Sequence, residues 1–257
     1  MRLGLMNNPA RDPLKEISRA AELGFDFLDL TLEPPACRAT DLDARRIKTA
    51  LENHNLGVVG HTAYYLPFGS AFDAVQAGAV AEAVHCLNLF AEIGVDRMNL
   101  HLDCRVPGYG PDYINGRNIA AIESLVAIAT PRKIRLMVEN VEGDSAESLA
   151  PIFDAVPGLG LHLDIGHANI ATTGRKSHTA DLLSRHADRL CHVHLSDNKG
   201  KSDDHLAIGA GKIDWKRELR LLKASGYDDT ITLEIFYGDG ELIRYSANKV
   251  RELWRTV

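Results

Sequence analysis

Histidine and carboxylate residues end most of the apolar runs in this sequence, and these residue types bind divalent cations and move protons. The runs read GVVGHTA, MNLHLD, LMVEN, LHLDIGH, HVHLSD and ITLEIF, and the loop DDHLAIGAG follows the fifth of them. Together they supply five histidines and four carboxylates, namely His61, His101, Glu139, Asp164, His167, His194, Asp203, His205 and Glu234. If the fold brings these side chains together, they could hold one or more metal ions and exchange protons with a substrate.

Two of the carboxylates stand in surroundings that favour a cation. Glu139 follows the apolar residues 136–138, and Glu234 lies between two apolar neighbours. An ionised glutamate inside an apolar strand costs several kcal/mol unless a cation or a partner compensates it. A divalent metal held by carboxylates and imidazoles removes this cost for several residues at once. We therefore expect a metal site with Mn²⁺ or Zn²⁺ as the favoured ions, and Mg²⁺ or Co²⁺ also suits these ligands.

Short apolar runs alternate with longer amphipathic stretches along the whole chain, which predicts alternating strands and helices. The predicted strands are Arg2–Met6, Phe25–Glu33, Val58–Ala63, Arg97–Asp103, Arg135–Val141, Leu159–Ile165, Leu190–Ser196 and Thr230–Phe236. The predicted helices cover about 12–24, 43–54, 71–93, 112–129, 145–155, 178–187, 214–224 and 240–255. Asp12 followed by Pro13, with Gly24 after the last turn, is typical of a helix start and end.

Eight strand–helix units in 257 residues, without a Pro/Gly/Ser-rich linker, predict one α/β domain over residues 1–257, a single (β/α)8 TIM barrel. A doubly wound sheet is the alternative, but no GxGxxG follows the first strand and no P-loop is present. The active site of a TIM barrel lies at the C-terminal ends of its strands. The nine ligand-type residues are predicted to meet there.

Composition limits the classes of binding partner and the cellular compartment that we expect for this protein. Lys and Arg total 29 against 35 Asp and Glu, so the formal net charge is −6 and no broad cationic field is available for nucleic acid. The four cysteines form no CxxC pair, which favours a reducing compartment. The N-terminus does not resemble a signal peptide, and no uninterrupted apolar run reaches the length of a membrane span. We expect a soluble cytoplasmic protein that binds a small molecule and no membrane; the oligomeric state is left open.

A histidine at the end of one strand is more often a hydrogen-bonded core or rim residue than a ligand, so the metal prediction rests on the repetition around the barrel. His162 and His192 lie two residues deeper than Asp164 and His194, and we interpret them as core or supporting groups. Asp29 and Glu33 on the second strand could contact substrate or form a cap or an ion pair. The remaining histidines fall in predicted helices or at their ends and are expected to be solvated: His54, His85, His178 and His186.

Two loops carry weaker signals. In GAGKIDW, residues 209–215, glycines precede a helix and Lys199, Lys201 and Lys212 lie close by, so the backbone N–H groups could hold a substrate phosphate. A loop that needs glycine in order to turn into the helix explains the same residues. After His61, the residues Tyr64, Tyr65, Pro67 and Phe68 could form an apolar wall for a sugar ring, or could simply pack the loop.

The nine residues, with the motifs DIGHA, HVHLSDNKG and DDHLAIGAGKIDW, make the chain similar to the xylose isomerase-like TIM barrel superfamily over nearly its whole length. In the isomerase and epimerase branch, the resemblance implies a divalent metal on Glu139, Asp164, His194 and Glu234. It also implies that Glu139 and Glu234 are the acid/base pair that interconverts a sugar or sugar phosphate through an enediolate. His61 and His167 would bind hydroxyls or assist proton transfer.

In the endonuclease IV branch of the same superfamily, all nine positions would hold three zinc ions for cleavage at abasic sites. The match of all nine favours this branch, but the loops that would face DNA depart from it. The loop after the second strand reads EPPACRAT, and ENVEGDS follows the strand-five glutamate in place of a Gly/Gln-rich turn. The sequence therefore favours a metal-dependent isomerase or epimerase with one to three metals. An endonuclease IV-like phosphodiesterase and a non-catalytic sugar-binding barrel are the alternatives.

Overall fold

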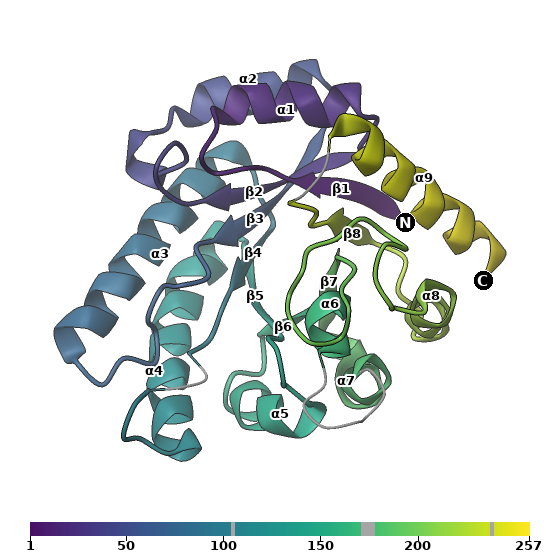
Figure 1. The fold of residues 1–257 in the computed structure, drawn as a ribbon. Helices are drawn as coiled ribbons and strands as arrows, with labels where there is room; N and C mark the ends of the chain where they lie inside the picture. The colour runs from purple at the N-terminus through teal and green to yellow at the C-terminus, as the bar shows by residue number, and fades with distance from the viewer. Residues whose placement is uncertain (104–105, 171–177, 237–238) are drawn as a thin grey trace.

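The computed structural model describes residues 1–103, 106–170, 178–236 and 239–257. Its strands form one closed parallel barrel in chain order, and β1 pairs with β8 to complete the ring (Figure 1). The strands are β1 (Arg2–Met6), β2 (Phe27–Leu32), β3 (Gly57–Thr62), β4 (Arg97–Leu100), β5 (Arg135–Glu139), β6 (Gly160–Asp164), β7 (Leu190–Leu195) and β8 (Thr230–Leu233). The predicted (β/α)8 TIM barrel is confirmed.

Helices that follow the strands surround the barrel (Figure 1). They are α1 (Pro13–Glu22), α2 (Ala44–Asn53), α3 (Asp73–Ile93), α4 (Pro111–Ala129), α5 (Ala146–Ala155), α6 (Ile165–Asn169), α7 (Thr179–His186), α8 (Trp215–Ala224) and α9 (Gly240–Thr256). Side-chain oxygens of Asp12, Asp43, Ser145 and Asp214 accept hydrogen bonds from backbone N–H groups of the first turns, and each cap satisfies groups that the helix leaves unpaired.

The barrel interior changes from apolar to polar along the strands. Phe27, Val59 and Met137 are buried together near the N-terminal ends of β2, β3 and β5. Two residues further along the same strands lie Asp29, His61 and Glu139, and side chains two apart in a strand share a face. Gly4 makes room for this lower layer, because a Cβ there would lie 2.2 Å from the Phe27 ring. The apolar layer closes the bottom of the barrel beneath the polar residues.

Helix α3 is, within the described ranges, the element that is long and apolar enough to cross a bilayer by length and composition. Of its most apolar window, 33% is buried inside the protein. Leu87, Phe90 and Ile93 join the hydrophobic core between the strands and the outer ring. The core helix of a folded barrel passes the same test, and α3 lies between β3 and β4 as an outer-ring helix of the barrel.

The structure differs from the sequence prediction in a few places. Strands β2, β4, β5, β6, β7 and β8 are shorter than predicted, because the ladder hydrogen bonds cover only part of each predicted run. The short helix α6 begins directly after Asp164, within what the sequence suggested was a strand end. His186 is 3% exposed and its Nε2 lies 2.9 Å from the Ala146 carbonyl oxygen, so the expectation that it is solvated is wrong. Cys104 lies outside the described residues.

Candidate metal centre

Four of the predicted ligands meet at the C-terminal ends of consecutive strands. Glu139 ends β5, Asp164 ends β6, His194 is the penultimate residue of β7, and Glu234 directly follows β8. One ligand atom from each lies within 4.8 Å of all the others. The four side chains are buried, with exposed fractions of 2%, 0%, 0% and 7% in that order. We call these four residues the quartet.

The quartet has the charge and the unpaired atoms that a divalent cation requires. His194 Nδ1 lies 3.2 Å from Glu234 Oε2, 3.8 Å from Glu139 Oε1 and 3.9 Å from Asp164 Oδ2. Asp164 Oδ2 is buried and has no hydrogen-bond partner among the described residues. Within those residues, the ion pairs of the three carboxylates are formed with histidines, and neither lysine nor arginine takes part. Three buried carboxylates around one imidazole fit Mn²⁺, Zn²⁺ or a similar ion.

The pKa values of the quartet residues without metal also favour binding of a cation. Burial, together with the negative charges of Glu139 and Glu234, raises the pKa of Asp164 to about 7. Burial alone would lower the pKa of His194, but Glu139, Asp29 and Glu234 outweigh it and hold that pKa well above its ordinary value. At neutral pH without a cation, His194 therefore carries a second proton and Asp164 is about half protonated. A metal ion would replace these protons.

A second group adjoins the quartet through Glu139. His101 Nε2 lies 3.0 Å and His61 Nε2 lies 3.7 Å from Glu139 Oε2. One ligand atom from each of the three residues lies within 4.8 Å of the others, so they could also hold a metal ion. Asn99 on β4 donates a hydrogen bond from Nδ2 to the same Glu139 oxygen over 2.6 Å. Glu139 is thus the residue that the quartet and this group share.

A third group lies on the other side of the quartet. Asp203 Oδ2 is 3.1 Å from His167 Nε2 and 2.6 Å from His205 Nε2. His205 Nδ1 lies 3.7 Å from Glu234 Oε2, which connects this group to the quartet. Burial lowers the pKa of His205, but Asp203 and Glu234 outweigh burial and raise it to about 9. All nine residues singled out in the sequence therefore lie in one connected network.

Two supporting asparagines were not found from the sequence. Asn99 contacts Glu139, as described above, and Asn140 directly follows it in the chain. Asn140 Nδ2 donates to the Asp164 carbonyl oxygen over 2.9 Å, and Asn140 Oδ1 accepts from the Asp164 N–H over 2.8 Å. The Asn140 carbonyl oxygen lies 3.0 Å from His167 Nδ1. The dipeptide Glu139-Asn140 at a strand end is the signal that could have indicated this role.

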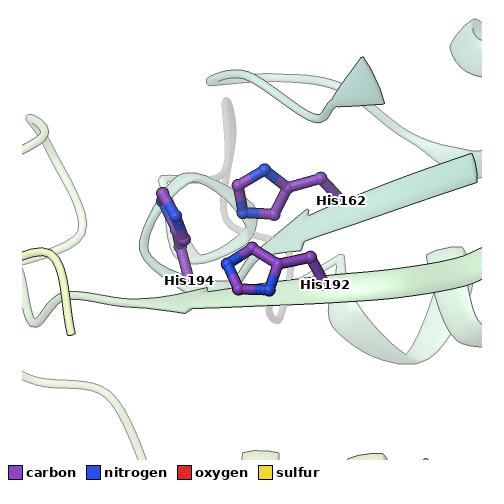
Figure 2. Close-up of side chains that lie close together, drawn as sticks. All are labelled: His162, His192 and His194. Carbon is purple, nitrogen blue, oxygen red and sulfur yellow. The ribbon is translucent and has the colours of Figure 1, made fainter. Parts of the chain in front are cut away.

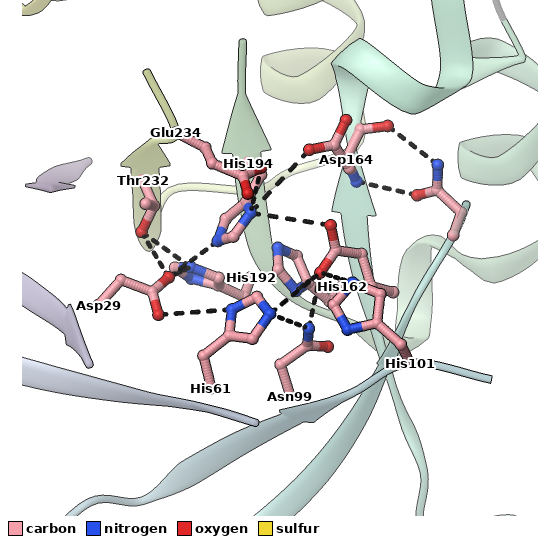
Figure 3. A network of polar contacts seen from close by, with 12 residues as sticks. Asp29, His61, Asn99, His101, His162, Asp164, His192, His194, Thr232 and Glu234 are labelled. Carbon is pink, nitrogen blue, oxygen red and sulfur yellow. Dashed lines mark hydrogen bonds and ion pairs between the residues drawn. The ribbon is translucent and has the colours of Figure 1, made fainter. Parts of the chain in front are cut away.

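Beneath the quartet lies a buried layer that contains His162 and His192 (Figure 2) and Asp29 (Figure 3). Both histidines are 0% exposed, as expected from their deeper position, and their ring centroids lie 4.0 and 5.3 Å from that of His194. Burial lowers the pKa of His192 to about 4, so this imidazole is neutral. Asp29 is also 0% exposed, and its Oδ2 accepts hydrogen bonds from His192 Nε2 and His194 Nε2, so in this structure the carboxylate faces these two histidines.

The loop after β7 is organised around a buried carboxylate. Asp197 is 0% exposed and accepts hydrogen bonds from the backbone N–H groups of Asn198, Gly209 and Ile213 and from Trp215 Nε1. A Cβ at Gly211 would lie 2.2 Å from Asp197 Oδ1, so the glycine is needed for close approach. The N–H groups of Gly209 and Ile213 thus serve the loop itself. The nearby lysines remain exposed: Lys199, Lys201 and Lys212.

Replacing Asp197 by Ala is expected to lower the free energy of unfolding by at least about 2 kcal/mol, because several buried donors lose their acceptor. Urea denaturation followed by circular dichroism measures the change. Lys201→Ala is the matched control, since Lys201 is exposed in the same loop, and should stay within about 0.5 kcal/mol of the wild type. Equal stability of the two variants would contradict the assigned role of Asp197.

Aromatic side chains border the site on two sides. Tyr64 is 70% and Tyr65 51% exposed, and the Tyr64 ring centroid lies 6.4 Å from that of His101. Phe68, in contrast, is 0% exposed and belongs to the core, so it forms no part of an open wall. Across the site, Phe236 is 58% exposed and stacks on His205 with ring centroids 4.1 Å apart. The exposed tyrosines remain available for contact with a ring-shaped substrate.

Solved structures with this fold include sugar epimerases. A D-tagatose 3-epimerase-like protein has a TM-score of 0.82 at 23% identity and covers 98% of this chain and 99% of its own. A D-psicose 3-epimerase determined in the presence of D-fructose has a TM-score of 0.83 at 16% identity and covers 99% of both chains. At these identities the likeness shows the shared fold.

Sequence relatives span most of the chain as well. An uncharacterized protein of Methanocaldococcus jannaschii is 35% identical over 238 residues, which cover 85% of this chain and 77% of the relative. The L-ribulose-5-phosphate 3-epimerase UlaE of Escherichia coli is 21% identical over 260 aligned positions, which cover 93% of this chain and 87% of the relative. The family model for the xylose isomerase-like TIM barrel matches residues 17–253. With that match over nearly its full length, the chain belongs to the xylose isomerase-like TIM barrel family.

Proposed function

We propose that this protein is a metal-dependent isomerase or epimerase of a sugar or sugar phosphate. The observation that carries the proposal is the quartet, in which two glutamates from β5 and β8 face the same space as Asp164 and His194. Moving a proton on a carbon next to a carbonyl requires a carboxylate base and an electrophile that stabilises the enediolate. The quartet residues would hold a divalent ion, which supplies that electrophilic polarisation when bound.

The residues of the chain would carry out proton transfer, orient the base and bind the substrate. Glu139 and Glu234 would take the proton from one face of the substrate and return a proton from the other. Asn99 holds the Glu139 carboxylate by its 2.6 Å hydrogen bond, which orients the glutamate for that role. His61 and His167, next to Glu139, would bind substrate hydroxyls or assist proton transfer. The buried position of the site limits the access of water.

The relatives support an epimerase within this class. UlaE and the D-psicose 3-epimerase are both named for 3-epimerisation, one of a sugar phosphate and one of a free sugar. We infer a ketose or ketose phosphate as substrate class, because a carbonyl adjacent to the inverted carbon makes that C–H acidic. The exposed lysines near the mouth suit a phosphorylated substrate: Lys199, Lys201 and Lys212.

Solvent exchange tests this proposal directly. We expect the Mn²⁺-loaded protein, incubated in D₂O with a panel of pentuloses, hexuloses and their terminal phosphates, to incorporate deuterium at a carbon next to the carbonyl of at least one sugar. Proton NMR of the recovered sugars measures both the exchange and the epimer formed. Binding of a sugar without exchange would instead support the non-catalytic barrel. Absence of both would contradict the proposal.

A second candidate is a zinc-dependent phosphodiesterase of the endonuclease IV type. The observation that favours it is that the nine residues form three adjoining groups, two of which share Glu139. This candidate predicts three zinc ions per chain by elemental analysis and cleavage of a duplex that contains one abasic site. One metal per chain, no cleavage and deuterium exchange into a sugar would exclude it in favour of the epimerase.

A further inference from the structure

Asp29 lies beneath the quartet on β2 and contacts it from the side away from the mouth (Figure 3). Its Oδ2 accepts hydrogen bonds from His194 Nε2 over 2.8 Å, His192 Nε2 over 3.1 Å and Thr232 Oγ1 over 2.9 Å. Its Oδ1 lies 3.6 Å from His61 Nδ1 and has no hydrogen-bond partner among the described residues. The one carboxylate therefore faces the rear nitrogens of two candidate metal ligands.

These contacts determine where the proton of His194 resides. An ionised carboxylate only accepts hydrogen bonds, so His194 must present an N–H at Nε2 to Asp29. In the neutral imidazole, the lone pair is then at Nδ1, which is the nitrogen that faces Glu139, Asp164 and Glu234. This is the tautomer that a metal ion in the quartet would need.

The groups around Asp29 also favour an N–H at His194 Nε2. His192 also gives its Nε2–H to Asp29, and its Nδ1 lies 2.8 Å from Thr230 Oγ1, which can donate to it. His192, His194 and Thr232 thus all donate their hydrogen bonds to Asp29 Oδ2. Among the described residues, the ion pairs of this carboxylate are with histidines only, so its negative charge remains close to the quartet. A negative charge behind a ligating imidazole raises the basicity of the nitrogen that binds the metal.

We propose that Asp29 is a positioning residue for the metal centre, which holds His194 as the Nε2–H tautomer and turns its Nδ1 toward the quartet. The proposal rests on the metal-binding part of the proposed function and not on the identity of the substrate. By its second oxygen Asp29 faces His61 as well, so one carboxylate would support a ligand of the quartet and a residue of the adjoining group.

Three variants separate the parts of this role. Asp29→Ala removes both the acceptor and the charge, Asp29→Asn keeps an acceptor oxygen but removes the charge, and Thr232→Val removes one donor to the same oxygen. We expect zinc affinity to fall about 10- to 100-fold in Asp29→Ala, which is the range for loss of such a supporting carboxylate. The loss should be smaller but measurable in Asp29→Asn, and Thr232→Val should stay within about threefold of the wild type.

Zinc affinity is measured by competition with a chromophoric chelator. Long-range ¹H–¹⁵N NMR spectra of the metal-free, histidine-labelled protein, recorded at a pH high enough to make His194 neutral, report its tautomer. Asp29→Asn should keep the Nε2–H tautomer, and Asp29→Ala should lose it. Urea denaturation of each variant separates general destabilisation from loss of metal binding. If Asp29→Ala does not fold, the reduced affinity of folded Asp29→Asn carries the test.

Two results would overturn the proposal. One is wild-type zinc affinity in Asp29→Asn or Asp29→Ala. The other is an equal loss of affinity in Thr232→Val, which would make Asp29 a general part of the buried network. Failure of the proposed sugar chemistry would look different, because the wild type would then bind zinc with the predicted tautomer and exchange no deuterium.

Discussion

Glu139→Gln is expected to lower kcat by about 10² to 10⁴-fold, which is the usual contribution of a positioned acid or base. The amide keeps the size of the side chain and an acceptor for the Asn99 hydrogen bond, but it cannot take a proton. Glu234→Gln should cause a loss of the same order, because the proposed reaction needs both carboxylates. Steady-state kinetics with the sugar identified by deuterium exchange measure the effect.

Glu142→Gln is the matched control for these two variants. Glu142 is exposed in the loop after β5, three residues beyond Glu139, and should leave kcat unchanged. Circular dichroism and metal analysis of the glutamine variants show whether the barrel and the cation are retained. Wild-type turnover in either Glu139→Gln or Glu234→Gln would contradict the assignment of the acid/base pair.

Removal of the metal should have the second large effect. We expect a chelator to abolish deuterium exchange and to lower stability, since a cation present at 1,000 times its dissociation constant contributes about 4 kcal/mol to the free energy of unfolding. Metal affinity should also fall as the pH drops below about 7, because Asp164, whose pKa is about 7, then binds the proton that the cation must displace. Thermal unfolding with and without Mn²⁺ or Zn²⁺, at pH 6 and pH 8, measures both effects.

Asp164→Asn provides the control for metal removal. This variant should show a much smaller rise in melting temperature on addition of metal, because one quartet ligand is weakened while the backbone contacts of residue 164 with Asn140 remain. If the wild type melts at the same temperature with and without Mn²⁺, Zn²⁺, Mg²⁺ or Co²⁺, the quartet is not a metal site.

Much of the arrangement could be predicted because barrel topology converts positions in the sequence into positions in space. Once eight strands are assigned, the ends of β3 to β8 must meet at one face, which brings Glu139 and Glu234 together although they are far apart in sequence. Alternation along a strand likewise placed His162 and His192 beneath Asp164 and His194.

The supporting contacts could not be predicted in this way. Whether Asp29 faces solvent, a substrate or His194 depends on the strand register and on which side chains cross the barrel. Neither can be predicted from the local sequence around Asp29. Asn99 carries no charge and stands between apolar residues, so the local sequence gives no signal of its contact with Glu139, whereas Asn140 is indicated only by its place directly after Glu139. The burial of His186 is likewise not predictable from its helical position, because a histidine near the end of an amphipathic helix can turn inward when a carbonyl such as that of Ala146 is available.

The closure of the ring between β1 and β8 has a consequence for how the centre forms during folding. The quartet comes from β5 to β8, whereas Asp29 comes from β2, which is joined to β8 through β1. Pairings between strands so distant in the chain form slowly, because the entropy of closing a long loop is lost before the new contacts stabilise the structure. A chain with its C-terminal half assembled would already present four ligands, but His194 would lack its rear carboxylate. Tight cation binding would then arise late, at ring closure, and its time course would report that event.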